Sequence, residues 1–376
     1  MSEARDRFVC SGRDWRPRGN PADAIAVLMS GGVDSSVAAA KLLHAGRELV
    51  GITMLIPSAL GPDCAGAELR ACCGQGAARV AGELGLPHYF VDVRDEFREQ
   101  VIARFRAAYR RGRTPSPCID CNTFIKFGVV MDLLRQTFGI EQVATGHYAR
   151  IERADGTARL YAVRHRKDQS YFLYGIPGDR LRRVVFPLAD QTKDETRREA
   201  RRRGLGAAEH AESADLCFAG QDDYRAALGP NPDAGPGDVL DLDGNVIGRH
   251  RGISNYTYGQ RGGLGIAAGI PLYVVDIDPT RNTVTLGDRD AARRRDVCAR
   301  HLNILAPDQL AVGSRLFGKV RAHQRAGACR ATEIADDRLV VRFETPQHGV
   351  APGQHLVLYS ESGQVIAGGE IVRPPR

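Results

Sequence analysis

An unbroken apolar run followed directly by a glycine turn constrains this chain more than any other feature. Residues 24–29, Ala-Ile-Ala-Val-Leu-Met, have the length of a strand and no polar member, which is typical of a buried strand. Ser30-Gly-Gly-Val-Asp-Ser-Ser36 follows, and residues 37–45 are rich in alanine and end near Gly46. Strand, glycine loop and helix in this order predict an α/β parallel sheet, with the loop at a strand's carboxyl end, where such sheets bind ligands.

The rest of the first half continues this alternation. We expect an irregular lead-in up to about residue 22, strands at 49–55, 88–93 and 142–145, and helices at 68–84, 96–110, 122–138 and 192–203. Thr192 and Glu195 form a capping-box pattern at the start of the last helix. Beyond about residue 220, short β-like runs predict a mostly β second half: 273–277, 283–286, 339–343 and 355–359.

Composition narrows the function classes. No apolar run has membrane-spanning length and the first residues lack a secretory apolar region, so we expect a cytoplasmic protein without a membrane partner. The net charge of +7 and the pI of about 9.0 favour a polyanionic partner such as nucleic acid. Arginines crowd residues 104–113, and Lys193, Arg197 and Arg201 follow helical spacing; both runs are candidate RNA patches or ordinary solvated faces balanced by acidic neighbours.

The loop after the first strand is a candidate phosphate site. Its two glycines let the backbone approach an anion, and the following helix directs its N–H groups toward that anion. Ser30, Ser35 and Ser36 add hydroxyl donors, whereas Asp34 would repel a phosphate unless it binds Mg²⁺ or caps the helix. No GxxxxGK[ST] string is present. The alternative is a plain glycine turn that opens a helix with serine capping.

Three of the nine cysteines lie in motif-like surroundings. Cys118 and Cys121 belong to RTPSPCIDCNTFIKF, where a helix start beside Cys121, together with Lys126 and upstream arginines, would lower the pKa of its thiol. Cys217 follows 96 residues later, in SADLCF. Replacing a carbonyl oxygen by sulfur needs an activated oxygen and a sulfur nucleophile, and two thiols can supply and then release a persulfide sulfur.

Other interpretations of these cysteines stay open. The pair Cys118 and Cys121 could be half of a zinc site, and with Cys217 it could hold an iron–sulfur cluster. All three could also be inert buried thiols. For the clustered Cys64, Cys72 and Cys73 we favour a packing role. The odd number of cysteines argues against a structural disulfide framework.

Several motifs, taken in order, resemble the bacterial tRNA-specific 2-thiouridylase family. They are SGGVDSS, similar to the PP-loop of ATP pyrophosphatases, then RTPSPCIDCNTFIKFG, ATGHYAR, KDQSYFLY, FPLAD, SADLCF, GRHRGISNYTYGQRGGLGI and PGQHLVLY. The resemblance implies three domains. These are a PP-loop catalytic domain of the adenine nucleotide alpha hydrolase type over residues 22–220, a small central β-rich domain over 221–294 and a C-terminal β-barrel domain over 295–376.

The resemblance also implies an activity: ATP and Mg²⁺ adenylate O2 of the wobble uridine in a tRNA anticodon loop, and sulfur from a protein donor gives 2-thiouridine, AMP and pyrophosphate. It implies Cys121 as nucleophile and Cys217 as the persulfide carrier, with a disulfide bond between cysteines in the cycle. ATP contacts are implied at Leu28, Met29, Ser30, Gly31, Gly32, Val33, Asp34, Ser35, Met54 and Gly146. tRNA contacts are implied at Ser116, Pro117, Cys118, His147, Lys167, Asp168, Gln169, Arg321 and Gln354.

The chain departs from the family pattern at some RNA-facing positions. Ser116 stands for the usual asparagine, Gly262 for a lysine, and Ala322 for the aromatic residue of a basic-aromatic-basic contact. Two rival functions are therefore kept. One is a PP-loop ligase or amidotransferase that acts on a small carboxylate without RNA. The other is a non-catalytic paralogue that binds RNA or a sulfur carrier.

Overall fold

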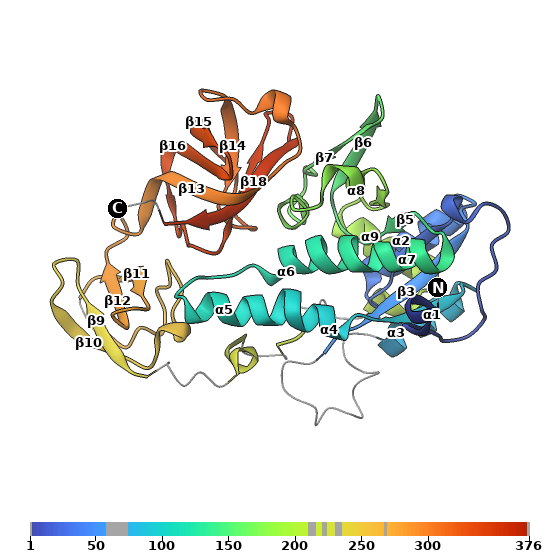
Figure 1. The fold of residues 1–376 in the computed structure, drawn as a ribbon, viewed down its shortest axis with the longest axis horizontal. Helices are drawn as coiled ribbons and strands as arrows, with labels where there is room; N and C mark the ends of the chain where they lie inside the picture. The colour runs from blue at the N-terminus through green and yellow to red at the C-terminus, as the bar shows by residue number, and fades with distance from the viewer. Residues whose placement is uncertain are drawn as a thin grey trace. The chain divides into compact units, whose positions relative to one another are not determined.

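The chain folds into two compact units in the computed structural model, which describes residues 2–57, 74–209, 216–219, 224–229, 235–266 and 269–373 (Figure 1). The N-terminal unit comprises Met1–Ile102 and Cys118–Ala227, and the C-terminal unit comprises Ala103–Pro117 and Leu228–Arg376. Residues 103–117 therefore belong to the C-terminal unit, although they lie within the first third of the sequence. No helix of the described ranges is both long enough and apolar enough to cross a membrane.

The N-terminal unit is built on a six-stranded sheet with strand order β1-β4-β3-β2-β5-β8. Its strands are β1 (Phe8–Cys10), β2 (Ile25–Leu28), β3 (Leu49–Leu55), β4 (His88–Asp92), β5 (Gln142–Ala144) and β8 (Val184–Val185). All neighbours pair in parallel except β1, which runs antiparallel to β4 at the edge. Every residue of β2 is buried, as its apolar sequence predicts, so the predicted α/β parallel sheet is confirmed.

Helices cover this sheet. They are α1 (Ser2–Asp6), α2 (Val33–His44), α3 (Gly74–Glu83), α4 (Arg94–Phe97), α6 (Pro117–Asp120), α7 (Val130–Phe138), α8 (Gly178–Leu181) and α9 (Lys193–Arg202), with 3₁₀ turns η1 (Pro21–Asp23), η6 (Ser170–Phe172), η7 (Gly206–Glu209) and η8 (Tyr224–Leu228). The alanines at 38–40 are all buried and let α2 pack closely against both the sheet and α9. The predicted capping box of α9 is confirmed: Thr192 Oγ1 accepts from the Glu195 N–H, and the Glu195 carboxylate accepts from the Thr192 N–H at 2.7 Å.

Two helical runs contain wide π turns where uninterrupted helices were predicted. These are η4 (Arg98–Ala103), between α4 and α5 (Arg104–Arg110), and η5 (Cys121–Val129), between α6 and α7. A π turn shifts the backbone hydrogen bonds by one residue and exposes carbonyl groups. In η5, Arg180 Nη1 donates to the carbonyls of Phe127 at 3.0 Å and Gly128 at 2.9 Å, which stabilises this geometry.

The prediction of an irregular lead-in is wrong. Residues 8–10 form β1, and the Phe8 ring packs edge-on against Phe138 at 5.0 Å and Tyr89 at 6.4 Å between ring centroids. Trp15 joins the same cluster, 5.9 Å from Phe138. Aromatic burial orders this segment in spite of its polar composition.

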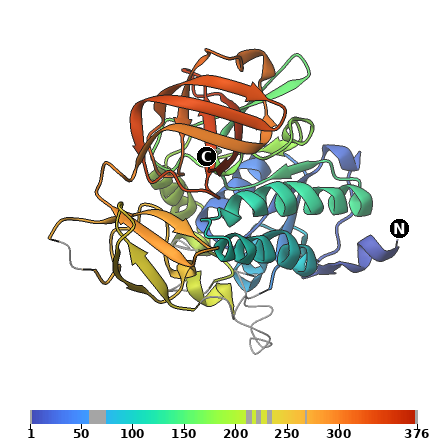
Figure 2. The same ribbon diagram turned by 60° about the vertical axis from the view of Figure 1, so that its left-hand side comes forward.

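The C-terminal unit is mostly β-structure, as predicted. One part is a four-stranded sheet of order β10-β9-β12-β11, formed by β9 (Gly237–Leu240), β10 (Val246–His250), β11 (Tyr273–Asp278) and β12 (Thr283–Gly287). The other is a closed antiparallel barrel of β13 (Arg293–Ile304), β14 (Arg315–Lys319), β15 (Gly327–Ala335), β16 (Arg338–His348), β17 (His355–Tyr359) and β18 (Val365–Val372), whose strands wrap around one another in Figure 2. The predicted C-terminal β-barrel is therefore confirmed. Two 3₁₀ turns, η9 (Ile253–Asn255) and η10 (Pro307–Gln309), complete the unit.

Protonation of His88 should destabilise the N-terminal unit. His88 on β4 lies between the hydroxyls of Ser11 and Thr53, and burial lowers its pKa from 6.5 to about 4. Since the folded state disfavours the proton, the stability contribution is complete above pH 6.5 and is lost as the pH falls toward 4, by up to about 3 kcal/mol. Urea unfolding followed by the fluorescence of Trp15, the chain's single tryptophan, measures this change.

The His88→Gln variant keeps polar contacts but cannot titrate. Its unfolding free energy should therefore vary less between pH 7 and pH 4 than that of the parent chain. The same pH dependence in both proteins would show that His88 does not cause the acid sensitivity.

Candidate functional site

The glycine loop joins β2 to α2 with its N–H groups directed away from the helix. Gly31 has φ +74°, a left-handed conformation that glycine adopts without strain, and Gly32 is the extended N-cap of α2. Within the described ranges, the N–H groups of Val33, Asp34 and Ser35 have no hydrogen-bond acceptor. The loop can therefore offer several backbone donors, and the positive end of a helix, to an anion.

The serine hydroxyls close the loop on itself. Ser35 Oγ donates to Gly32 O at 3.1 Å and accepts from the Ser30 N–H at 3.2 Å, while Ser36 Oγ donates to Gly32 O at 2.9 Å. Ser35 and Ser36 are buried, and Ser30 is exposed. The buried hydroxyls thus hold the loop in shape, which leaves the backbone amides as its main anion donors.

Asp34 is neutralised by a lysine from a distant segment. Lys193 Nζ, at the first residue of α9, lies 2.8 and 2.7 Å from the two carboxylate oxygens, and the Tyr148 hydroxyl donates to Oδ1 at 2.7 Å. The Lys193 side chain is only 12% exposed. This pairing answers the repulsion between Asp34 and a phosphate, because the carboxylate charge is compensated within the protein.

Two sequence interpretations are corrected here. Lys193 does not belong to an exposed basic face, because its ammonium group is mostly buried against Asp34. Tyr148 and Tyr171, considered as candidates for base stacking, are 2% and 1% exposed, so their rings pack in the core. The sequence did signal Lys193 at a helix start, but nothing local indicated that the start of α9 faces the glycine loop.

Gly146 lies against the glycine loop. A Cβ atom at Gly146 would lie 2.7 Å from both Asp34 C and Ser35 N, so no other residue fits without moving the loop. Met54 lies at the carboxyl end of β3, beside β2, and Leu28 and Met29 are buried below the loop. The residues expected to contact ATP therefore surround the carboxyl end of β2 in one unit.

The cysteine-bearing helix starts earlier than predicted. α6 begins at Pro117, so Cys121 lies one turn inside the helical run, at the first residue of η5, and is 8% exposed. Cys118, in the first turn, is exposed. Although solvent touches it, desolvation by the surrounding protein raises the pKa of the Cys118 thiol, and the positive charge of Lys126 opposes that shift.

Lys126 and Asn122 link this helix to the segment around residue 172. Asn122 Nδ2 donates to Phe172 O at 3.0 Å, and Lys126 Nζ donates to Asn122 Oδ1 at 3.0 Å. Asp168 and Gln169 act within the same region: Asp168 accepts from the Ser170 hydroxyl, and Gln169 accepts from the Tyr148 N–H at 2.9 Å. Lys167 is exposed.

His147 is held neutral beside this helix. Its Nδ1 lies 2.7 Å from Thr145 Oγ1, and its ring lies 6.3 Å from Phe127 and 6.0 Å from Phe186 between centroids. Burial, and then the charge of Lys126, hold the pKa of His147 well below its usual value of 6.5. A neutral imidazole can accept or donate one hydrogen bond but cannot serve as a cation at neutral pH.

Cys217 lies in the short described stretch 216–219 and is exposed. The neighbouring Phe218 packs edge-on against Phe97 of α4 at 5.8 Å, and α4 packs against η5, which carries Cys121. The two thiols thus belong to adjoining parts of one unit. Cys64, Cys72, Cys73 and Asp215 lie outside the described residues.

The proposed cluster ligands do not come together as a metal site. Within the described ranges, no three cysteine, histidine or carboxylate side chains form a group able to hold a metal ion, and Cys118, Cys121 and Cys217 all lie in those ranges. The alternative of an iron–sulfur cluster on these sulfurs is not supported. The six described cysteines also form no disulfide.

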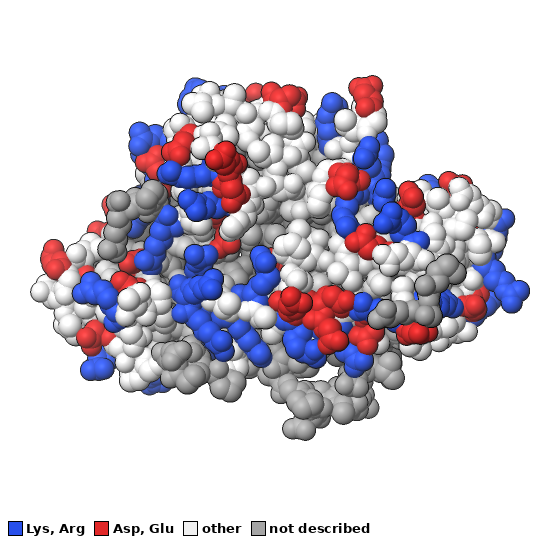
Figure 3. Space-filling model, in the orientation of Figure 1, with Lys and Arg blue, Asp and Glu red and all other residues white. Residues whose placement is uncertain are grey.

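In the C-terminal unit, two predicted RNA contacts bind backbone carbonyls instead. Arg321 donates through Nε to Gly349 O at 2.8 Å and through Nη2 to Tyr258 O at 2.5 Å. Gln354 Nε2 donates to Thr114 O at 3.0 Å and Pro115 O at 3.1 Å. Basic side chains gather over α5 in Figure 3, where Arg104, Arg110 and Arg111 are exposed.

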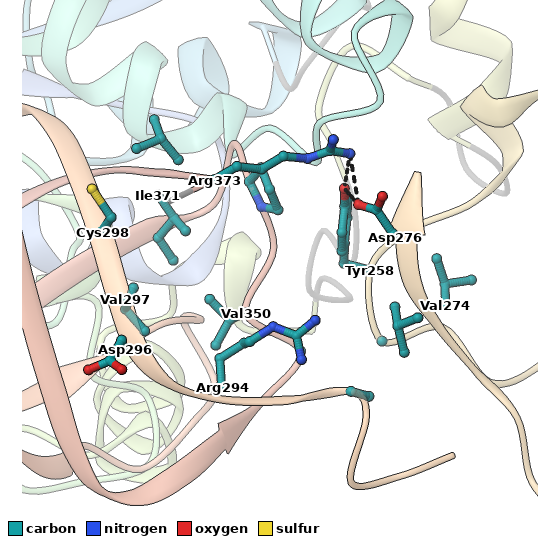
Figure 4. Close-up of a pocket in the computed structure, with 16 residues that line it drawn as sticks. Tyr258, Val274, Asp276, Arg294, Asp296, Val297, Cys298, Val350, Ile371 and Arg373 are labelled. Carbon is teal, nitrogen blue, oxygen red and sulfur yellow. Dashed lines mark hydrogen bonds and ion pairs between the residues drawn. The ribbon is translucent and has the colours of Figure 1, made fainter. Parts of the chain in front are cut away.

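A pocket of about 270 Å³ lies between the four-stranded sheet and the barrel of this unit. Arg373 closes one side: its guanidinium binds the Tyr258 hydroxyl at 2.6 Å and Asp276 at 2.9 Å, whereas Arg294 reaches in from the barrel (Figure 4). Burial raises the pKa of Tyr258 to about 12, so its hydroxyl stays protonated. Together with Arg321, these bonds fasten the four-stranded sheet to the barrel at both ends of Tyr258.

Family comparisons cover almost the whole chain. A tRNA methyl transferase HUP domain matches residues 23–221, a tRNA methyl transferase PRC-barrel domain matches 230–288, and an aminomethyltransferase beta-barrel domain matches 294–372. The tRNA-specific 2-thiouridylase MnmA of Pelotomaculum thermopropionicum is 42% identical over 93% of this chain and 96% of its own length. The chain belongs to the tRNA-specific 2-thiouridylase family.

Other members of the 2-thiouridylase family match equally broadly. Those of Pelobacter propionicus and Chloroflexus aurantiacus are each 43% identical, over 92% and 93% of this chain and 97% and 98% of their own lengths. Among solved structures, NMN synthetase from Francisella tularensis covers 55% of this chain and 68% of its own, with a TM-score of 0.31 at 16% identity, which is too distant to inform the site.

Removing the Lys193 charge should weaken nucleotide binding. In Lys193→Met the Asp34 carboxylate stays uncompensated beside the loop amides, and its repulsion of phosphate should lower the affinity for ATP by about tenfold or more. Calorimetric titration with ATP and Mg²⁺ measures the change. Lys41→Met, in the last turn of the same helix, is the matched control and should bind ATP like the parent chain; equal affinity in all three proteins would contradict this role of Lys193.

Proposed function

We propose that this chain is a tRNA 2-thiouridine synthase, an ATP-dependent sulfurtransferase acting on the wobble uridine of the anticodon loop. The observation on which the proposal depends is the full-length similarity to 2-thiouridylases, in a chain that keeps both the glycine loop and the two motif cysteines. The compensated Asp34 and the open loop amides support a phosphate-binding role for this loop.

In the first step, O2 of the uridine attacks the α-phosphorus of ATP, and pyrophosphate leaves. We assign the nucleotide contacts to Leu28 through Ser35, Met54 and Gly146. Mg²⁺ would enter with the nucleotide and neutralise its phosphate charge, because both Asp34 oxygens are already engaged and magnesium needs few protein ligands. The loop amides would hold the phosphates while the adenylated O2 becomes a leaving group.

In the second step, sulfur replaces that oxygen. A protein donor leaves a persulfide on Cys217, and its terminal sulfur attacks C2 of the uridine as AMP leaves. The Cys121 thiolate then attacks the Cys217 sulfur, which releases 2-thiouridine and forms a Cys121–Cys217 disulfide. A dithiol reductant must reduce this disulfide before the next turnover.

The anticodon loop would be bound near Cys118. We assign RNA contacts to Ser116, Pro117, Cys118, His147 and Lys167, and the exposed basic side chains over α5 supply a surface for phosphates. For Asp168, Gln169, Arg321 and Gln354, the internal hydrogen bonds favour roles in shaping the protein.

Loss of the persulfide carrier should separate the two steps. With ATP, unmodified tRNA and a persulfide donor, Cys217→Ser should release pyrophosphate in a first turnover, yet form 2-thiouridine at least about 10³-fold more slowly. Pyrophosphate release and nucleoside mass spectrometry measure the two steps. Cys10→Ser, on β1, is the control and should stay active; near-normal thiolation by Cys217→Ser would refute the assignment.

Loss of the nucleophile should instead trap RNA on the protein. In Cys121→Ser the sulfur reaches C2, but no thiol cleaves the bond to Cys217, so a protein–S–S–tRNA adduct should accumulate. A gel without reductant detects this adduct, and added dithiothreitol should release 2-thiouridine from it. Normal turnover without any adduct would show that Cys121 does not resolve the intermediate.

A further inference from the structure

The segment that leads into the cysteine helix is held by the C-terminal unit. Residues 112–117, here called the approach segment, directly precede Cys118, and they group with the β-rich second half of the chain. Pro115 and Pro117 have no N–H groups, so the segment can form few backbone bonds of its own. Its hydrogen bonds come instead from the loop between β16 and β17.

Gln354 makes the central contact. Its amide nitrogen donates to two consecutive carbonyls, Thr114 O at 3.0 Å and Pro115 O at 3.1 Å. The Thr114 N–H donates to Pro352 O at 2.8 Å, so the backbone of Thr114 is bound through both its polar groups. Because Thr114 and Ser116 are buried, losing these bonds would leave carbonyl groups without water to replace them.

The contact surface is shaped for this segment on both sides. Gly353 has φ +90°, and a Cβ atom there would lie 2.9 Å from Arg113 Cβ and 3.0 Å from Thr114 N. Arg113 Nη1 forms an ion pair with Glu370 of β18 at 3.0 Å. Gly112, with φ +63°, lies against Ile277 in the same close manner.

We propose that Gln354 is a positioning residue that sets the approach segment, and through it the start of the helix bearing Cys118 and Cys121. Only Ser116 and Pro117 separate the bound carbonyls from Cys118, and a displacement passes along so short and proline-stiffened a stretch. The barrel thus contributes to the proposed chemistry by orienting thiols that belong to the other unit. This inference rests on the proposed function for its catalytic consequence, but not for its structural one.

Thiol reactivity tests the structural part without RNA, ATP or turnover. Gln354→Met keeps side-chain length but removes the N–H donors, and we expect iodoacetamide to alkylate Cys121, which is 8% exposed in the parent chain, about tenfold faster. The rate at Cys217, which is outside the helix, should not change. Peptide mass spectrometry follows both sites. Gln364→Met is the matched control, because Gln364 is also buried in the barrel but pairs with Gln309.

Kinetics test the catalytic part. Gln354→Met should lower kcat for thiolation by about tenfold, because misplaced reacting groups slow the chemical step, with less than about twofold change in the KM for tRNA. Unchanged alkylation with a raised KM would make Gln354 an RNA contact and overturn the proposal. An equal effect of Gln364→Met, or faster alkylation at Cys217 too, would indicate general loosening and also overturn it. If the parent chain formed no thiouridine while Cys121 still responded, only the proposed function would fail.

Discussion

The ion pair between Asp34 and Lys193 is the interaction on which the rest of the candidate site depends. A carboxylate at the start of α2 would repel the anions that the loop's open amides otherwise attract. Lys193 and the Tyr148 hydroxyl compensate that charge, and they come from two segments more than 100 residues away from the loop. Both partners are mostly buried, so salt screens the pairing less than it would at the surface. The same bonds therefore prepare the loop electrostatically and fix its position against α9.

The cysteine helix shows a similar division of labour. Its interior is fixed within the N-terminal unit, where Arg180 binds the carbonyls exposed by the π turn and Asn122 binds the segment around Phe172. The segment leading into it is fixed by the barrel through Gln354. A reactive thiol placed by bonds at both ends of its helix needs little rearrangement at the moment of reaction, which is the usual benefit of a preorganised site.

Local sequence patterns predicted the regular elements well and the long-range contacts poorly. The buried β2, the strand at 355–359 and the capping box of α9 follow from apolar runs and cap residues that neighbours in the sequence define. The hairpin of β6 (Arg150–Ala154) and β7 (Thr157–Tyr161) was missed, although Asp155 and Gly156 at its turn, both with positive φ, give a recognised hairpin signal. β1 was missed because three residues are too few to show alternation.

The site was predictable only in its chemistry-bearing strings. The glycine loop and the cysteines were evident, but the pairing of Lys193 with Asp34 depends on how α9 packs against α2, which no local pattern encodes. Likewise, Gln354 and Arg321 suggested RNA contacts as single polar residues, whereas the fold brings backbone carbonyls to them. Polar side chains with long-range backbone partners are the residues for which sequence reasoning is least informative.

Nucleoside mass spectrometry of total tRNA from host cells, with and without this gene, tests the central claim most directly. The account predicts that wobble 2-thiouridine is lost when the gene is removed and returns when the intact chain is supplied, but not when Cys217 is replaced by serine. Undiminished 2-thiouridine without the gene, in a host with no second thiolase, would contradict it.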